Sequence, residues 1–311
     1  MRVWLPYADL AEADQRLGGL PAGIEPDFYR AEGDDFPASI ADVEFYVIPY
    51  MRGEAELRNV AEMTSLKVIQ TLTAGVDNFL PLVPPGVTLC NAAGVHDAST
   101  AELAIALTLA SGRHLDAFAR SQATSRWEPV FGTALADQRV LILGYGRIGA
   151  AIEARLAGFE VASVTRVARR ARTDPEVHPT SALLELLPTA DVLIVIAPLT
   201  ADTEGIVGAD ALSRMPDGAL VVNVARGKLV ETDALLAETG SGRLRAALDV
   251  TDPEPLPDDH ELWTVPNVII SPHVGGASSA FFPRADAMIK DQLERFVAGT
   301  ELANVVEAEA S

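Results

Sequence analysis

Three ionisable side chains in the second half of the chain stand at or just beyond the ends of predicted strands: Arg226, Glu254 and His273. An arginine can grip a carboxylate, a histidine exchanges a proton near neutral pH, and a carboxylate can orient the imidazole and favour its charged form. Each of them alone is more often a surface charge or a structural histidine. The three together favour proton transfer to a small carboxylate-bearing ligand, provided that the fold gathers them in one place.

Strands and helical stretches alternate along most of the chain, and this alternation predicts parallel sheets with crossover connections. In an open parallel sheet the carboxyl ends of the strands face the ligand crevice, so the three side chains should converge. The sequence therefore predicts an α/β protein with two doubly wound parallel-sheet domains. The expected strands are 2–7, 44–50, 66–73, 87–92, 139–144, 160–165, 191–197, 219–225, 246–250 and 267–273, and the expected helices are 10–17, 54–62, 98–119, 147–156 and 284–297.

A glycine motif, GYGRIG at 144–149, follows one of these strands and opens the next helix. The pattern G-x-G-x-x-G is weak alone, but this order of elements makes it a strong sign of dinucleotide binding. Gly144 permits the tight turn, Gly146 lets the backbone approach a pyrophosphate, and Gly149 lets the helix pack closely on the sheet. The helix N-terminus offers unpaired N–H groups to the phosphates. The alternative is a turn that needs glycine for backbone reasons only.

The strand after this helix is expected to end at Thr165-Arg166, where an NAD site usually carries an acidic residue for the ribose 2′-hydroxyl. Arg169, Arg170 and Arg172 follow closely. A carboxylate would repel a 2′-phosphate, whereas a hydroxyl and guanidinium groups would bind it. We therefore predict NADP(H) as the cofactor and leave NAD(H) open. The alternative, a solvated loop whose arginines balance acidic neighbours, suits Arg170 and Arg172 better than Arg166.

The length of 311 residues suggests two domains at roughly 150 residues each. The amphipathic helix expected at 284–297 lies beyond the last strand of the second series and is expected to return to the first domain. We therefore predict that a dinucleotide-binding Rossmann domain, 98–282, is inserted into a substrate domain formed by 1–97 and 283–311.

The composition excludes several classes of protein. There are 44 acidic against 24 basic side chains, a formal net charge of -20 that would repel nucleic acid over most of the surface. The single cysteine excludes an internal disulfide and a thiolate metal cluster, and no other group has convincing metal-ligand spacing. The sequence shows neither a signal-type N-terminus nor an apolar run of the roughly 18 residues that a membrane span needs. We expect a cytoplasmic protein with no nucleic-acid, membrane or metal partner.

The motifs together resemble the D-2-hydroxyacid dehydrogenase family, whose members include phosphoglycerate dehydrogenases and glyoxylate/hydroxypyruvate reductases. The resemblance extends from about residue 66 to the end and is looser over the first sixty residues. The segments that carry it are TLTAGVDNF (71–79), NAAGVHDASTAELAIALTLA (91–110), GYGRIG (144–149), APLTADTEGIVG (197–208), NVARGKLV (223–230), LDVTDPEPLP (248–257) and SPHVGG (271–276).

The resemblance implies a role for each site residue. The family's arginine, glutamate and acid/base histidine fall on Arg226, Glu254 and His273, and the turn that binds the substrate carboxylate falls on Ala74, Gly75 and Val76. Asp249 matches a position near the nicotinamide carboxamide, and the Thr165-Arg166 pair resembles the NADP-using members. The expected cofactor-binding residues are Thr100, Gly144, Tyr145, Gly146, Arg147, Ile148, Gly149, Thr165, Arg166, Ala197, Pro198, Thr203, Val224, Ala225, Asp249 and Gly275.

The expected reaction is hydride transfer from NADPH to a small 2-oxo acid of the glyoxylate or hydroxypyruvate kind, which gives the D-2-hydroxy acid. A phosphoglycerate or a bulkier 2-hydroxy acid as substrate, and a non-catalytic NAD(P)-sensing protein, stay open as alternatives. The resemblance also implies a homodimer with the helix at 98–119 in the interface, against ordinary packing within the domain. Tyr50, Met51 and Arg52, in the loop after an early strand, either shape substrate choice or lie in solvent.

Overall fold

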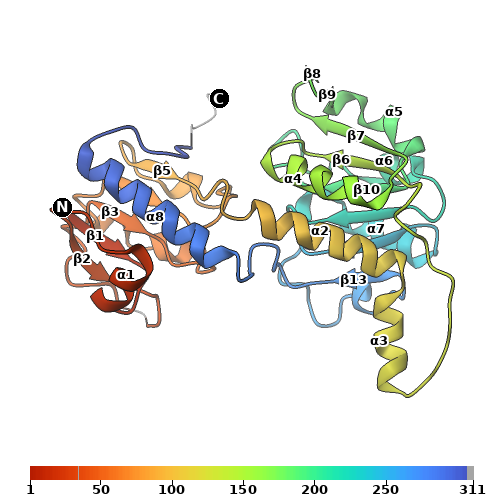
Figure 1. Cartoon of the computed structure of the whole chain (residues 1–311), viewed down its shortest axis with the longest axis horizontal. Coiled ribbons are helices and arrows are strands. Elements are labelled where there is room, and N and C mark those ends of the chain that lie inside the picture. Colours follow the sequence, from red (N-terminus) through yellow and green to blue (C-terminus); the bar gives the residue numbers. More distant parts are fainter. Residues whose placement is uncertain (34, 307–311) are drawn as a thin grey trace. The chain divides into compact units, whose positions relative to one another are not determined.

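The computed structural model describes residues 1–33 and 35–306 and divides the chain into two compact units (Figure 1). Unit 1 comprises residues 1–96 and 279–311, and unit 2 comprises residues 97–278. The sequence predicts crossings after residues 97 and 282, and the end of the predicted substrate domain, 307–311, lies outside the described residues. Across those residues, no helix is long and apolar enough to cross a membrane, and no cluster of His, Cys, Asp and Glu could hold a metal ion.

Unit 1 is built on a five-stranded sheet in the order β2-β1-β3-β4-β5, with every pair of strands parallel. The sequence does not predict β2, because its residues EPDF form no apolar run. The strand lies at the sheet edge, where proline is tolerated. The strands are β1 (Arg2–Leu5), β2 (Glu25–Phe28), β3 (Phe45–Val47), β4 (Val68–Gln70) and β5 (Thr88–Cys90).

Both faces of this sheet are buried. Side chains alternate along β1, so Val3 and Leu5 join one apolar cluster and Trp4 joins the other. Helices α1 and α8 cover the first face, and residues around two short 3₁₀ turns, η1 and η2, cover the second. The sequence predicts one helix at 54–62 where these two turns occur. The helical elements of unit 1 are α1 (Leu10–Leu17), η1 (Glu54–Leu57), η2 (Val60–Glu62), η3 (Leu80–Leu82) and α8 (Phe281–Ala298).

Unit 2 contains an eight-stranded sheet in the order β13-β12-β11-β10-β6-β7-β9-β8. Its core order follows the doubly wound dinucleotide-binding pattern, in which the strand order reverses beside the first strand, here β6. The predicted fold class is confirmed. Only β8 runs antiparallel to its neighbour, and the sequence predicts neither β8 nor β9. The strands are β6 (Arg139–Leu143), β7 (Ser163–Ala168), β8 (Arg172–Thr173), β9 (Glu176–Pro179), β10 (Val192–Val195), β11 (Leu220–Asn223), β12 (Arg245–Leu248) and β13 (Val268–Ile270).

This sheet too is buried on both faces, as expected for parallel strands with crossover helices. Along β6, Leu141 and Leu143 pack with α5, α6 and α7, whereas Val140 and Ile142 pack with α2 and α4. The α-helices of unit 2 are α2 (Asp97–Gly112), α3 (Leu115–Ala123), α4 (Arg147–Leu156), α5 (Leu183–Leu186), α6 (Ala209–Arg214) and α7 (Thr232–Gly240); the 3₁₀ turns are η4 (Ala157–Phe159), η5 (Thr180–Ala182), η6 (Leu187–Thr189), η7 (Gly227–Leu229) and η8 (Glu261–Thr264).

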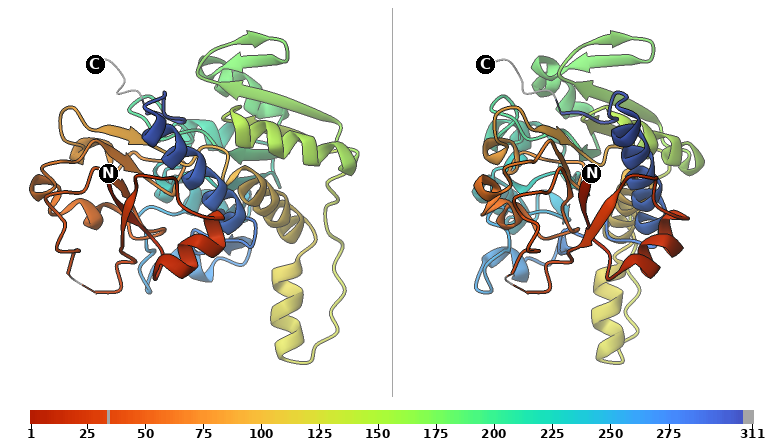
Figure 2. Two further views of the ribbon diagram at one scale, coloured as in Figure 1. Left: turned by 60° about the vertical axis from the view of Figure 1, so that its left-hand side comes forward. Right: turned by 90° about the vertical axis from the view of Figure 1, so that its left-hand side faces the viewer.

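The helix predicted at 98–119 is two helices. His114, between α2 and α3, has the left-handed φ of 54°, which ends the first helix and redirects the chain. Residues 113–131, named the arm here, then extend away from the sheet of unit 2 and return as an extended segment (Figures 1 and 2). At its base the Thr133 N–H donates to the Gly112 carbonyl over 2.7 Å. Gly112 and Gly132 cross so closely there that a Cβ on either would overlap backbone.

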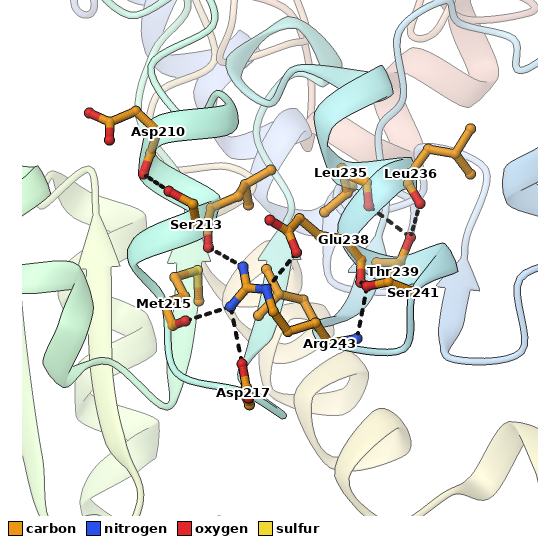
Figure 3. Close-up of polar contacts among 12 residues, drawn as sticks. Asp210, Ser213, Met215, Asp217, Leu235, Leu236, Glu238, Thr239, Ser241 and Arg243 are labelled. Carbon is orange, nitrogen blue, oxygen red and sulfur yellow. Dashed lines mark hydrogen bonds and ion pairs between the residues drawn. The ribbon is translucent and has the colours of Figure 1, made fainter.

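Arg243, just before β12, ties α6 to α7 on one face of the unit 2 sheet (Figure 3). Its guanidinium donates to the carbonyls of Leu212 and Met215, at the C-terminal end of α6, over 2.6 and 2.7 Å. It also pairs with Glu238 of α7 over 2.5 Å. A cation at a helix C-terminus satisfies carbonyls that have no partner inside the helix. The two helices that support β11 and β12 are thereby held together.

Candidate active site

The glycine loop lies between β6 and α4, at the point where the strand order reverses. A Cβ at Gly144 would overlap the backbone of Ile196 and Ala197, and one at Gly149 would overlap the carbonyl of Gly144. Gly146 differs, because a Cβ there would meet nothing within 4 Å. Two glycines are therefore required by packing, whereas the third faces open space beside the start of α4.

That open space fits a pyrophosphate. No side chain caps the N-terminus of α4, so its first N–H groups point outward with the positive end of the helix dipole. Arg147, in the first turn, is exposed and pairs with Asp97 of α2 over 2.8 Å. The next residue, Ile148, packs against the apolar cluster below the helix. The residues present thus suit the dinucleotide that the sequence predicts.

The strand β7 ends later than predicted, at Ala168 rather than residue 165, because VTRVA continues the pairing with β6. Thr165 and Arg166 consequently lie within the strand. The guanidinium of Arg166 makes a two-pronged ion pair with Glu153 of α4, which the sequence does not predict. That hydrogen bond and charge lower the pKa of Glu153 below its ordinary value. Arg169 and Arg170, both exposed, are the residues that follow the strand.

Tyr145, the second residue of the glycine motif, is the centre of a charged cluster. Its hydroxyl donates to Glu153, and the guanidinium groups of Arg166 and Arg172 lie 5.5 and 5.4 Å from its ring centroid. Arg172, on β8, also donates to the carbonyl of Tyr145. The antiparallel β8–β9 extension is thus attached to the glycine loop.

The loops after β10 and β11 approach the same edge of the sheet. Ala197 and Pro198 follow β10, and the Thr203 hydroxyl closes their loop by donating to the Pro198 carbonyl over 2.7 Å. Val224 and Ala225 follow β11 and are buried. These five predicted cofactor residues therefore line the carboxyl edge beside the glycine loop.

Arg226 leaves β11 at this edge, and its neighbour Gly227 fixes its position. A Cβ at Gly227 would overlap the carbonyl of Thr251, so only glycine lets the segment after β12 lie against the β11 loop. The carbonyl of Arg226 accepts a hydrogen bond from Asn223 Nδ2 over 2.8 Å. The close backbone contact carries Arg226 toward the segment that leads to Glu254.

His273 and Glu254 form a direct pair: His273 Nδ1 lies 2.5 Å from Glu254 Oε1. Burial opposes ionisation of Glu254, but the hydrogen bond and charge of His273, with a further contribution from Arg226, outweigh it and lower the pKa of Glu254. The carboxylate therefore stays ionised through the neutral range, and the pair is lost on the acid side only as pH falls through this lowered pKa. The structure thus brings together the three side chains predicted from their strand ends.

A buried carboxylate, Asp249, shapes the turn that carries His273. Its Oδ1 accepts from the Ser271 hydroxyl over 2.6 Å and from the Val274 N–H over 2.9 Å, and its Oδ2 accepts from the Gly275 N–H over 2.8 Å. His273 itself has a φ of 52°, a left-handed conformation that costs free energy in a non-glycine residue and is concentrated at functional sites. Asp249 therefore stabilises the strained turn that presents the histidine.

Thr100 of α2 borders the same turn. A Cβ at Gly275 would lie 3.0 Å from Asp249 Oδ2 and 3.5 Å from Thr100 Oγ1, so glycine suits the space between the buried carboxylate and the helix. One residue earlier on α2, Ser99 Oγ lies 2.5 Å from Ser278 Oγ. The start of α2 and the histidine turn are accordingly packed as one part of unit 2.

In unit 1, the predicted carboxylate-binding turn follows β4. The Ala74 carbonyl accepts from Asn91 Nδ2 and the Gly75 carbonyl from the Thr73 hydroxyl, each over 2.9 Å. Within the described residues, the N–H groups of Gly75 and Val76 donate no hydrogen bond to the protein. Since backbone donors without an acceptor are rare in folded proteins, these two amides are suited to an external anion.

Comparison with known proteins agrees with this geometry. The family model for the NAD binding domain of D-isomer specific 2-hydroxyacid dehydrogenases matches residues 105–275. Glyoxylate reductase/hydroxypyruvate reductase of Homo sapiens is 34% identical over 225 residues, 69% of each chain. Glyoxylate/hydroxypyruvate reductase B of Pectobacterium atrosepticum is 32% identical over 275 residues, 83% of this chain and 85% of the relative. The chain belongs to the D-isomer-specific 2-hydroxyacid dehydrogenase family.

A solved structure extends the similarity to the whole fold of this dehydrogenase. The NADPH-dependent glyoxylate/hydroxypyruvate reductase of Sinorhizobium meliloti, in complex with NADP and malonate, has a TM-score of 0.81 at 28% identity. The match covers 98% of this chain and 96% of that one. The family predicted from the motifs is thereby confirmed, together with a nicotinamide dinucleotide as the class of cofactor.

Sequence reasoning missed two contacts of the dehydrogenase site. The first is the hydrogen bond from Ser271 to Asp249. The position of Ser271 could have indicated it, because the residue lies at a strand end two residues before His273, where its hydroxyl can reach a neighbouring strand. Glu153 gave a weaker signal, since it belongs to the helix that packs beside β7 but lies 13 residues before its partner Arg166.

Removing the negative charge of Asp249 tests its role in positioning His273. In Asp249→Asn, one carboxylate oxygen becomes an NH₂ group that faces a backbone donor, so we expect the free energy of unfolding to fall by about 2 kcal/mol. We also expect kcat for 2-oxo acid reduction to fall at least tenfold. Chemical denaturation and initial rates measure both. Ser271→Ala, which leaves the two backbone donors, should have a smaller effect on each; equal kcat in wild type and Asp249→Asn would contradict this role.

Proposed function

We propose that this dehydrogenase reduces a small 2-oxo acid, of the glyoxylate or hydroxypyruvate kind, to the D-2-hydroxy acid: 2-oxo acid + NADPH + H⁺ gives 2-hydroxy acid + NADP⁺. The observation that carries the proposal is the pairing of His273 with Glu254 near Arg226, on the sheet edge that also holds the glycine loop. The glyoxylate/hydroxypyruvate reductases among its relatives support the substrate class.

His273 supplies the proton in this proposal. Its Nδ1 is engaged by Glu254, so Nε2 is the ring atom left to donate to the substrate's carbonyl oxygen. Glu254 holds the ring in this orientation and balances the charge of the imidazolium. Arg226 polarises the carbonyl and contacts the substrate carboxylate. The bound nicotinamide cofactor supplies the hydride, and the fixed orientation of the reactants provides much of the rate.

The substrate carboxylate is bound by backbone amides of unit 1 in the same proposal. The N–H groups of Gly75 and Val76 are adjacent, and no acceptor among the described residues occupies them. Two N–H donors aimed at one anion recognise a carboxylate without a counter-charge. The Ala74 and Gly75 carbonyls are both hydrogen-bonded, which keeps the turn in place.

His273→Gln tests the proton donor. We expect kcat with glyoxylate and NADPH to fall about 10²–10⁴-fold, the usual contribution of a general acid, with the Kd of NADPH changed by less than threefold. Absorbance at 340 nm and fluorescence titration measure these quantities. His260→Gln, which removes a histidine that accepts from the Leu262 N–H outside this site, is the matched control.

A variant His273→Gln that retains near-normal turnover would show that another group donates the proton. The substrate panel for the wild type also includes hydroxypyruvate, 3-phosphohydroxypyruvate and longer 2-oxo acids, so that it distinguishes the alternative substrates. Tight NADPH binding with no oxidation by any acid would instead favour an NAD(P)-sensing protein.

We assign the preference for NADPH to Arg169 and Arg170 rather than to Thr165 and Arg166. The end of the second strand of a dinucleotide-binding domain is where the ribose 2′-substituent is recognised, and β7 ends at Ala168. Two exposed guanidinium groups follow it, with no carboxylate between them and the strand. Arg166 lies within β7, before the end of the strand, and pairs with Glu153.

The double variant Arg169→Gln/Arg170→Gln should raise the KM for NADPH at least tenfold and the KM for NADH less than threefold, since only NADPH carries the 2′-phosphate. Initial rates with each cofactor at saturating substrate measure the change. Arg166→Gln should affect the two cofactors alike, because it breaks an internal ion pair. A loss of NADPH selectivity in Arg166→Gln alone would return the phosphate contact to the position predicted from the sequence.

We propose in addition that two copies associate through the arm. Within it, Trp127 and Phe131 are 96% and 103% exposed, and Leu115 and Val130 are more than half exposed. Exposed aromatic side chains that belong to one projecting element mark an association surface. The partner proposed is a second copy of this chain, since two-fold symmetric homodimers are the commonest soluble oligomers. The sequence predicts the helix at 98–119 in the interface, and this range covers most of α2 and the start of α3 in the arm.

Trp127→Ser/Phe131→Ser should convert the dimer to a monomer by removing two large apolar contacts. Size-exclusion chromatography with light scattering should give twice the 33.0 kDa chain mass for the wild type and the single chain mass for the variant. Trp263→Ser, a half-exposed tryptophan outside the arm, should remain dimeric. A wild type that is monomeric at micromolar concentration would contradict the proposal.

A further inference from the structure

Unit 1 contains a cavity of about 200 Å³ at the carboxyl edge of its own sheet. The residues that follow four neighbouring strands line it: Tyr7 after β1, Arg30 after β2, Tyr50 after β3 and Leu72 after β4. The first turns of α8 close it with Phe281 and its neighbours. The cavity therefore belongs to the loops at one end of the sheet.

The sheet order makes this the expected position for a ligand. In the order β2-β1-β3-β4-β5, the strand that follows β1 lies on one side of it, and the strands that follow β3 lie on the other side. The connections after β1 and β3 therefore run in opposite directions, and a crevice opens beyond the carboxyl ends of these two strands. Ligands of open α/β sheets bind at such a reversal point. The glycine loop occupies the corresponding point of the unit 2 sheet, and this cavity occupies that of unit 1.

One wall of the cavity is rigid and apolar. The rings of Tyr50 and Phe281 stack with centroids 4.1 Å apart, and His96 stacks on both at 5.7 and 5.5 Å. Leu72 and Ile289 are buried and add aliphatic surface. This wall suits the methylene groups of a short side chain, because it is already ordered before a ligand arrives.

The polar lining differs from the wall in having a net positive charge. Arg16 pairs with Asp286 over 2.8 Å, and Arg30 pairs with Glu32 over the same distance. Arg52 is the third arginine of the lining, and no carboxylate of the described residues lies within ion-pair distance of it. Arg52 is thus the guanidinium at this cavity that is available to an external anion.

The backbone around Arg52 holds it at the rim. Met51 before it has a φ of 61° and Gly53 after it a φ of 69°, so the chain reverses sharply at this residue. A methionine in the left-handed region is strained, and such strain is concentrated at functional sites. From this turn Arg52 contributes to the lining of the cavity.

The cavity also adjoins the turn that binds the substrate carboxylate in the proposed function. Leu72, in its lining, lies two residues before Ala74, and its carbonyl is 2.8 Å from His96 Nε2. A substrate held by the amides of Gly75 and Val76 would therefore have its remaining carbons close to this lining.

We propose that the cavity receives the side chain of the 2-oxo acid and that Arg52 binds a carboxylate at its far end. The preferred substrates are then dicarboxylic 2-oxo acids, in which two or three carbons separate the carbonyl from the second acidic group. This inference rests on the proposed function, because the reacting end of the substrate is the same. In a chain of net charge -20, a local cation of this kind selects for the anionic side chain over a neutral one.

The test compares two substrates of matched shape, 2-oxoglutarate and 5-methyl-2-oxohexanoate, in which an isopropyl group replaces the second carboxylate. With NADPH and the full-length wild type, we expect kcat/KM to be at least tenfold higher for 2-oxoglutarate, mainly through KM. In Arg52→Met this ratio should fall at least tenfold. Arg30→Gln, which removes an arginine of the same rim that is paired with Glu32, should change it less than threefold.

Binding provides a readout that does not need turnover. Calorimetry with the NADP⁺-loaded protein should show that glutarate binds at least tenfold more tightly than hexanoate, and that Arg52→Met removes the difference. Reduction of glyoxylate without any preference for the dicarboxylic acid would overturn this inference and leave the proposed function intact. Loss of all reduction, with Arg52-dependent glutarate binding retained, would reject the proposed function and keep the anion site. Equal ratios in wild type and Arg52→Met would also overturn the inference.

Discussion

The carboxylate of Asp249 is the constraint on which the rest of the site depends. A charged group that is 1% exposed is costly to bury, and three hydrogen-bond donors offset that cost. All three donors belong to the turn around His273, so the turn can relax only by leaving a buried anion unsatisfied. The left-handed backbone of His273 is thereby stabilised, and its ring meets Glu254 on the strand-end loop beside it. One buried charge thus fixes both the position and the direction of the imidazole.

Close backbone contacts supply the other fixed distances. Gly144 lies against the chain that leaves β10, and Gly227 lies against the segment that leaves β12. In each case an added Cβ would overlap main-chain atoms, which cannot move aside as a side chain can. The loops of neighbouring strands are consequently drawn together at the carboxyl edge. The glycine at 146 has no such contact, and this difference separates the glycines that the packing of the fold requires from the one that faces open space.

The sequence predicted most of this arrangement because parallel strands have long apolar runs and their carboxyl ends share one edge. It failed where the local signal was absent. EPDF carries no apolar run, so β2 was missed, and the break between α2 and α3 was missed although Gly112 ends the first helix two residues before His114. Arg166 was expected at the end of its strand, but β7 continues to Ala168. Its ion pair with Glu153 was missed because Glu153 belongs to another element. Long-range ion pairs have no period along the chain, so the sequence predicts where cations occur but not which are neutralised.

The difference between arginines in ion pairs and arginines without a carboxylate partner decides where an acidic protein can bind anions. Arg166 with Glu153, Arg16 with Asp286 and Arg243 with Glu238 are neutral pairs at short range, whose fields largely cancel a few ångströms away. The surrounding surface carries a large negative excess, so an anionic ligand is repelled except near a guanidinium or an amide without such a partner. Counting arginines along the sequence therefore overestimates the number of anion sites. The informative quantity is the number of guanidinium groups without a carboxylate partner, and among the described residues Arg52 is in no ion pair.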